Sequence, residues 1–161
     1  MIHQINVREA TPDDIPLIAE LILDLAEYEK LADLISYNHE DIRRALFSDS
    51  PDAEVRIGEV DGKPEGFALF FHNYSTFLGR RGLYLEDLFV RPEARGKGLG
   101  KRLLVELAKT AKARDCARME WFVLDWNVPS IEFYKSLGAQ PMEGWKIFRL
   151  TSDNISALAG L

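Results

Sequence analysis

Three glycines alternate with basic residues between positions 95 and 101, in the run Arg95-Gly96-Lys97-Gly98-Leu99-Gly100-Lys101. Glycine lets a backbone come close to a ligand, and the N–H groups that open a helix bind phosphate oxygens. Arg95, Lys97 and Lys101 add positive charge at the same point. We therefore expect a phosphate-binding loop here. The simpler alternative is a flexible turn ahead of a helix, but a turn does not need three glycines interleaved with cations.

Two better-known phosphate motifs do not fit this loop. A dinucleotide fingerprint requires a third glycine where Lys101 stands. A P-loop requires its first glycine where Arg95 stands and a hydroxyl where Arg102 stands. The loop therefore predicts an anion site of another type.

A second chemical signal lies in residues 126–139, which read W-N-V-P-S-I-E-F-Y-K-S-L-G-A. Asn127 is a typical helix cap and Pro129 is suited to a first helical turn, so Tyr134 is expected one turn further on. A tyrosine there is either a proton donor or a buried aromatic residue whose hydroxyl bonds the backbone. The residue alone does not separate these two interpretations.

The pair Glu86-Asp87 is the main polar break in an apolar stretch over residues 83–90. A carboxyl group in an apolar strand is costly to bury unless it has a use, so Glu86 is a candidate general base. The alternative is a carboxylate that faces solvent or pairs with Arg80 or Arg81.

The patterning that must position these groups mixes strands and helices. We expect strands over residues 2–8, 54–60, 66–71, 83–90, 118–124 and 144–150. We expect helices from Thr11 to about Tyr28 and over residues 38–47, 98–115 and 129–137, with a loop over residues 73–82. The dipeptide Asp61-Gly62 predicts a hairpin, whereas alternating elements later in the chain favour parallel pairing. The expected fold class is α/β, with a mixed sheet covered by helices.

Composition bounds the class of protein. With 161 residues, we expect a single domain over residues 1–161. No apolar run approaches the ~20 residues needed to cross a bilayer, and no secretory signal is visible at the start. One cysteine, Cys116, excludes an internal disulfide, and the three scattered histidines lack zinc spacing. We predict a cytoplasmic protein with no metal and no membrane contact.

Charge is uneven along the chain. Residues 1–60 carry a net charge of −9, whereas residues 91–118 carry +6. This split indicates a cationic ligand for the first part and an anionic ligand for the second, although exposed helix faces that simply differ in charge would produce it too. The basic stretch is short and the remaining surface would repel phosphate, which argues against nucleic acid as a partner.

The glycine loop and the run over residues 127–139, in this order and spacing after the strand, resemble the GNAT superfamily of acetyl-CoA-dependent N-acetyltransferases. Further segments are similar to its diamine and thialysine branch, which includes the spermidine/spermine enzyme: E-Y-E-K at 27–30, Y-L-E-D-L-F-V at 84–90, V-L-D-W-N at 123–127 and E-G-W at 143–145. The resemblance spans about residues 5–150 and implies the GNAT fold, with a central mixed, largely antiparallel, twisted sheet flanked by helices. It also implies a homodimer.

The resemblance assigns roles to particular residues. Backbone groups of Leu88, Phe89 and Val90 would pair with the pantetheine arm of acetyl-CoA, and the loop would hold its pyrophosphate through Arg95, Gly96, Lys97, Gly98, Leu99, Gly100 and Lys101. Asn127 and Ser130 would contact the cofactor further along, and Tyr134 would lie near its sulfur. Glu86 would face the acceptor amine, in a pocket lined by Tyr28 and Glu29.

Elementary chemistry agrees with these roles. An alkyl amine has a pKa of ~10.4, so it is protonated at neutral pH and needs a base, for which Glu86 is the candidate. Direct attack on the thioester builds an oxyanion that a strand amide near Leu88 would stabilise. Tyr134 would then protonate the departing thiolate as general acid. No covalent enzyme intermediate is needed, so Cys116 has no assigned role.

The expected acceptor is a small cation: a diamine, a polyamine, or a lysine analogue such as thialysine. Residues 73–79 lack the acidic residue that the resemblance associates with polyamine acetylation, which favours short amines or lysine analogues. The acids Asp24, Glu27 and Glu29 would attract the cation. Two alternatives remain open, namely a protein lysine or N-terminal acetyltransferase and a non-catalytic acyl-CoA sensor.

Overall fold

Strands and helices are interspersed along the chain in the computed structural model, which describes residues 1–161. The strands are β1 (Ile5–Glu9), β2 (Glu54–Val60), β3 (Lys63–Ser75), β4 (Arg80–Val90) and β5 (Met119–Trp121). The α-helices are α1 (Ile15–Tyr28), α2 (His39–Phe47), α3 (Leu99–Ala113), α4 (Val128–Ser136) and α5 (Ser152–Ala159). Short 3-10 turns cover Pro12–Asp14, Ala32–Leu34 and Pro92–Ala94. No helix combines the length and the apolar character needed to cross a bilayer.

The chain forms two units, residues 1–124 and residues 125–161. The first unit contains the whole sheet together with α1, α2 and α3, and the second contains α4 and α5. The sheet, its faces and its core therefore belong to the first unit alone.

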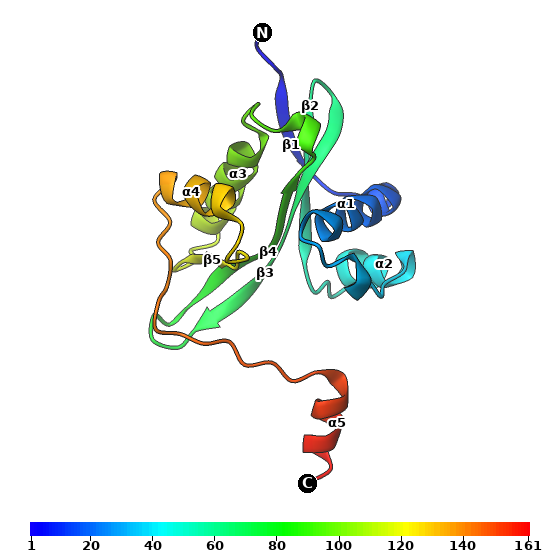
Figure 1. The fold of residues 1–161 in the computed structure, drawn as a ribbon, viewed down its shortest axis with the longest axis vertical. Helices are drawn as coiled ribbons and strands as arrows, with labels where there is room; N and C mark the ends of the chain where they lie inside the picture. The colour runs from blue at the N-terminus through cyan, green and yellow to red at the C-terminus, as the bar shows by residue number, and fades with distance from the viewer. The chain divides into compact units, whose positions relative to one another are not determined.

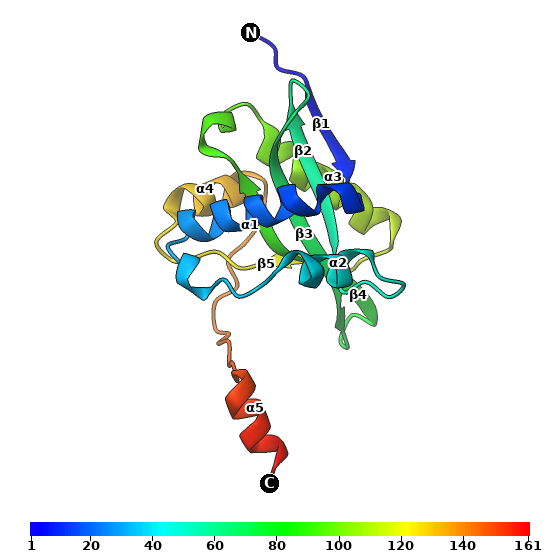
Figure 2. The same cartoon turned by 90° about the vertical axis from the view of Figure 1, so that its right-hand side faces the viewer.

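The five strands lie in the order β1-β2-β3-β4-β5. The first four pair antiparallel with their sequence neighbours, and β5 pairs parallel to β4. Helices α1 and α2 cover one face of this sheet and α3 covers the other (Figure 1). Figure 2 looks onto the face that carries α1 and α2, which lie in front of the strands. The mixed, largely antiparallel sheet between helices confirms the expected fold class.

Helices α1 and α3 cover the sheet with apolar faces. On α3, the buried residues are Leu99, Leu103, Leu104, Leu107 and Ala111. On α1, Ile15, Ile18, Leu21 and Leu25 are buried. Burying such side chains stabilises the unit by roughly 1.5–3 kcal/mol each. The start of α3 is thereby fixed on the sheet.

Two glycines let the start of α3 approach the strands. A Cβ atom added to Gly58 of β2 would lie 2.7 Å from the Leu99 side chain, and one added to Gly66 of β3 would lie 2.6 Å from the Phe89 carbonyl oxygen. Both distances are shorter than carbon atoms allow without movement. The Leu99 side chain, at the first residue of α3, therefore packs directly against Gly58, and the β4 backbone lies close to Gly66.

The hairpin at Asp61-Gly62 is confirmed, but two element predictions were wrong and one helix was missed. The expected loop over residues 73–82 is mostly strand, because β3 and β4 pair out to Ser75 and Arg80 around a turn at Gly79. The expected strand over residues 144–150 does not form, and α5 was not expected. The alternating apolar residues of the 144–150 segment are typical of a strand, but this segment pairs with no other strand.

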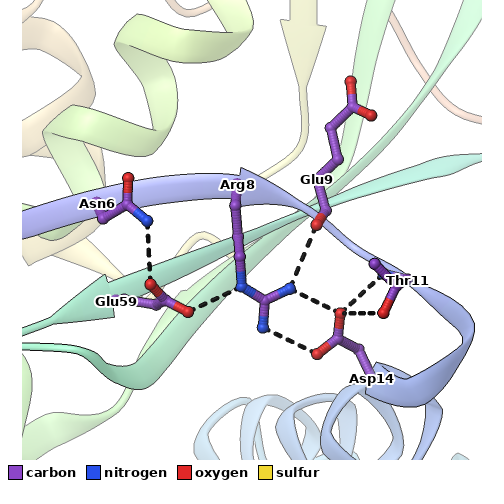
Figure 3. Close-up of polar contacts among 6 residues, drawn as sticks. All are labelled: Asn6, Arg8, Glu9, Thr11, Asp14 and Glu59. Atoms are coloured by element: carbon purple, nitrogen blue, oxygen red, sulfur yellow. Dashed lines mark hydrogen bonds and ion pairs between the residues drawn. The ribbon is translucent and has the colours of Figure 1, made fainter.

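A network around Arg8 ties strands β1 and β2 to the turn that leads into α1 (Figure 3). The Arg8 guanidinium donates to Asp14 at 2.8 and 2.9 Å and to Glu59 of β2 at 2.8 Å. Asn6 donates to the other oxygen of Glu59, and the Thr11 N–H donates to Asp14. Because the hydrogen bonds from Arg8 favour both carboxylates, the pKa values of Asp14 and Glu59 are lowered.

Replacing Arg8 by Met should destabilise the protein by roughly 2–3 kcal/mol at pH 7, because it leaves two mostly buried carboxylates without their partner. Groups whose pKa is lowered by folding stabilise above their unfolded pKa and lose that effect as pH falls. The difference between wild type and R8M should therefore shrink as pH falls below about 4. Denaturant unfolding across that range measures it. Arg44→Met, which breaks an exposed pair with Asp41, should cost no more than ~0.5 kcal/mol; a pH-independent defect in R8M would contradict the prediction.

Candidate active site

A β-bulge in β4 shifts the register at Glu86. Leu85 pairs with Phe70 of β3, but the next β3 pairing joins Leu69 to Asp87, so Glu86 is the extra residue. Bulges bend a strand and re-aim its side chains, and they are common beside active sites. The bulge interrupts the regular alternation of β4 at its two consecutive acidic residues.

The change of register brings Asp87 onto the face covered by α1. Its pairing partner Leu69 lines an apolar groove together with Ile18 of α1. The neighbouring Phe70 ring lies on the other face, with the Arg114 guanidinium at the end of α3 5.9 Å from its centroid. Leu69 and Phe70 thus point to opposite faces, and the residue paired with Leu69 shares the α1 face.

Three carboxylates meet on this face: Glu29, Glu86 and Asp87. Burial, together with the negative charges of Glu86 and Glu29, raises the pKa of Asp87 to about 7. Burial also raises the pKa of Glu29. Glu86 itself is exposed, and its charge adds to the effect of burial in raising the pKa of Tyr84. Asp87, whose ionisation is opposed by two neighbouring carboxylates, is suited to a cationic ligand, which would relieve the repulsion.

The same bulge marks the point where β4 loses a neighbour. Strand β5 pairs with β4 only from Leu83 to Leu85. On the side away from β3, no strand of the sheet pairs with the β4 backbone from Glu86 to Val90. Leu88, Phe89 and Val90, the residues expected to pair with a pantetheine arm, therefore present a strand edge on which an extended amide chain would fit.

The glycine loop has the geometry of an anion site. Gly96 and Gly98 have φ angles of 75° and 93°, in the left-handed region that favours glycine. The first intrahelical bond of α3 runs from the Arg102 N–H to the Gly98 carbonyl at 3.0 Å. Amides before it have no acceptor within the helix, namely those of Leu99, Gly100 and Lys101. Arg102 is paired with Glu106 at 3.0 Å, so Lys97 and Lys101 are the cations available beside these amides.

The end of α1 adjoins this loop. Tyr28 is the last residue of α1, and its ring lies 6.3 Å from that of Phe89 in β4. The Arg95 guanidinium lies 4.5 Å from the centroid of the Tyr28 ring, and its Nε donates to the Val90 carbonyl at 2.9 Å. The first unit therefore brings together the residues predicted for the amine pocket and for the thioester end of the cofactor.

Asn127, Ser130 and Tyr134 belong to the second unit. Asn127 caps α4 as expected, accepting a hydrogen bond from the Ser130 N–H at 3.4 Å. The spacing 127, 130 and 134 puts the three residues on one side of α4, and the Tyr134 ring lies 5.5 Å from that of Phe133. The roles expected for these three residues stay predictions.

Two expectations for the acidic side chains change with the structure. Asp24 was expected to attract the cation, but its carboxylate accepts a hydrogen bond from Arg91 at 3.0 Å, which neutralises it. Asp87 was not expected in the site. Its position directly after Glu86 was the only signal, and the bulge that turns both acids to one region has no mark in the sequence. Arg80, a possible partner of Glu86, pairs instead with Asp115.

A model of the acetyltransferase (GNAT) family matches residues 20–139, a span that includes the bulge, the glycine loop and α4. The chain belongs to the GNAT family of acetyltransferases. It is therefore an acetyltransferase, and the resemblance of its glycine loop to that family is confirmed.

Individual GNAT relatives are similar in sequence to this chain over nearly its full length. Thialysine N-epsilon-acetyltransferase of Bos taurus is 37% identical over 97% of this chain and 98% of its own. L-ornithine N5-acetyltransferase of Arabidopsis thaliana is 32% identical over 95% of this chain and 87% of its own. A solved integron cassette protein from the mobile metagenome of V. cholerae superposes with a TM-score of 0.79, at 26% identity over 96% of this chain and 97% of that one.

The raised pKa of Asp87 predicts a pH-dependent loss of stability. The native protein holds a proton on Asp87 that the unfolded chain releases between about pH 4 and pH 7, so stability falls as pH rises through this window. Asp87→Asn removes this dependence. Relative to wild type, D87N should gain a few kcal/mol between pH 4 and pH 7.5, because each pKa unit is worth ~1.4 kcal/mol. Denaturant midpoints across the window measure the effect, and two parallel pH profiles would refute it.

Proposed function

We propose that this GNAT enzyme transfers acetyl from acetyl-CoA to the primary amine of a small cationic acceptor, by direct attack and without a covalent enzyme intermediate. The observation that carries the proposal is the carboxylate cluster of Glu29, Glu86 and Asp87 beside an open strand edge. A protonated amine seated among these groups would be attracted before reaction. The names of the relatives, which act on thialysine and ornithine, support an amine of this class.

The glycine loop supports the co-substrate part of the proposal. GNAT enzymes use acetyl-CoA as co-substrate, and the pyrophosphate of CoA is a dianion that matches free helix-start amides beside Lys97 and Lys101. The residues from Arg95 to Lys101 would hold it. The unpaired edge over Leu88, Phe89 and Val90 would direct the pantetheine arm toward Glu86.

The proposed reaction balances with the residues at hand. Glu86 accepts a proton from the ammonium group, directly or through a water, and the free amine forms a bond to the thioester carbonyl carbon. A strand amide near Leu88 stabilises the oxyanion. The carbon–sulfur bond then breaks, Tyr134 gives its proton to the thiolate, and the attacking nitrogen gives its surplus proton to the tyrosinate, which leaves an N-acetylamine and CoA. Asn127 and Ser130 would contact the cofactor on the same side of α4.

The acceptor we favour is the side-chain amine of a small dibasic amino acid, such as lysine, thialysine or ornithine. Residues 73–79 contain no acid that would extend the negative surface toward a long polycation. Tyr28 and Glu29 would line the amine pocket with Glu86. Diamines and polyamines would be poorer acceptors than these amino acids.

Three further parts of the proposal concern the whole molecule. The family match spans the boundary between the two units, which supports one acetyltransferase domain over residues 1–161. A homodimer is proposed because Ile155 and Leu158 form an apolar face on α5 that a second copy would cover. Light scattering on the purified chain tests it. A cytoplasmic location, and binding of neither metal, membrane nor nucleic acid, stay predictions of the sequence.

The function is tested by thiol release from acetyl-CoA with thialysine, lysine, ornithine, putrescine and spermidine, ranked by kcat/KM. Peptides with a free lysine or N-terminus serve as the comparison. We expect the dibasic amino acids to rank first. Preference for peptides would favour a protein acetyltransferase, and tight acetyl-CoA binding without thiol release on any acceptor would favour a sensor.

Tyr134→Phe should lower kcat by roughly 10-fold or more while leaving acetyl-CoA affinity little changed, because it removes a proton donor and keeps the ring. Steady-state kinetics and calorimetric titration with CoA separate the two quantities. Unchanged turnover in Y134F would remove Tyr134 from the mechanism.

Glu86→Gln should impair acetylation most near neutral pH and regain activity as pH rises, since more of the amine is then deprotonated in solution. The ratio of kcat/KM between wild type and E86Q, measured from pH 7 to pH 10, gives the result. A ratio that does not change with pH would count against a base at this position.

A further inference from the structure

The Arg95 side chain contacts residues outside its own loop. Its Nε donates to the Val90 carbonyl at 2.9 Å, and its guanidinium carbon lies 4.5 Å from the centroid of the Tyr28 ring and 5.6 Å from that of Phe89. The backbone of Arg95, in contrast, leads directly into Gly96 and the start of α3. The backbone of Arg95 is therefore part of the glycine loop, while its side chain packs on the end of α1.

The contact with Tyr28 matters because the next residue in the chain is the acidic Glu29. Glu29 caps α1, with its N–H donating to the Leu25 carbonyl at 2.9 Å, so its carboxylate is positioned by the last turn of the helix. That carboxylate lies close enough to Asp87 to raise its pKa. The Tyr28 ring packs against both Arg95 and Phe89, which themselves lie close together, and these contacts fix the turn that carries Glu29.

We propose that Arg95 is a positioning residue for the amine acceptor, which acts through its stacking on Tyr28 and couples occupation of the phosphate loop to the shape of the acceptor pocket. This inference rests on the proposed function. A ligand that orders the loop also orders Arg95, and through Tyr28 the turn that carries Glu29. Coupling between two sites is reciprocal in binding free energy, so an amine in the pocket should tighten CoA binding as much as CoA tightens amine binding.

The geometry requires arginine in particular. A planar guanidinium stacks on an aromatic ring while its Nε donates sideways, as toward Val90 here, whereas a lysine ammonium is a compact point charge that makes only one of these contacts well. Tyr28 contributes its ring face to this contact, so Phe at that position should serve and Leu should not. These two substitutions separate the stacking from other effects of Arg95.

The test is a double-mutant cycle with Arg95→Ala and Tyr28→Leu, followed through the KM for thialysine and for acetyl-CoA and through calorimetric CoA binding with and without lysine. R95A should raise the amine KM by roughly 5- to 30-fold, in the usual range of site–site coupling, and abolish the effect of lysine on CoA affinity. In the Y28L background R95A should change the amine KM by less than about 2-fold. Arg95→Lys should recover only part of the loss, and Tyr28→Phe should keep the coupling.

Arg44→Ala is the control for losing an arginine, because Arg44 is exposed on α2 and pairs only with Asp41. A phosphate-ligand role would make R95A raise only the KM for acetyl-CoA, and that result would overturn the inference while leaving the proposed function intact. Equal effects of R95A on the amine KM in both Tyr28 backgrounds would overturn it too. A wild-type enzyme that acetylates none of the amines would instead refute the proposed function, and the inference with it.

Discussion

The bulge at Glu86 is the constraint on which the rest of the site depends. It interrupts the pairing of β3 with β4 at the residue where the pairing of β4 with β5 also stops. One irregularity therefore does two things: it turns Glu86 and Asp87 out of strict alternation, and it coincides with the opening of the β4 edge. Without it, strict alternation would place Glu86 and Asp87 on opposite faces of the sheet.

Residues 1–60 carry a net negative charge, but several of their acidic side chains are paired with arginines in the fold. Asp14 and Glu59 form ion pairs with Arg8, and Asp24 forms an ion pair with Arg91. Paired carboxylates contribute little to attraction at a distance, because their field is cancelled locally. From this first part, Glu29 contributes to the group that would face a ligand, and Glu86 and Asp87 of β4 supply the rest.

Most of the framework was predictable because it depends on periodicity and capping. The buried positions of α3, the hairpin at Asp61 and the cap at Asn127 all depend on neighbours in sequence. The failures depend on partners far away in the chain. Residues 73–75 and 80–82 are strand because β3 and β4 pair there, although their polar residues are typical of a loop. Asp87 lies near Glu29 because a bulge in β4 and the end of α1 meet at the same place. For the same reason the contact of Arg95 with Tyr28, 67 positions apart, has no sequence signature.

Positions 58 and 66 have little room for any residue larger than glycine. Both positions lie within strands that otherwise accept bulk, yet a single methyl group at Gly58 would press on Leu99. Alanine at Gly58 would therefore displace a side chain at the first residue of α3, whereas alanine at Gly66 would meet the backbone of β4.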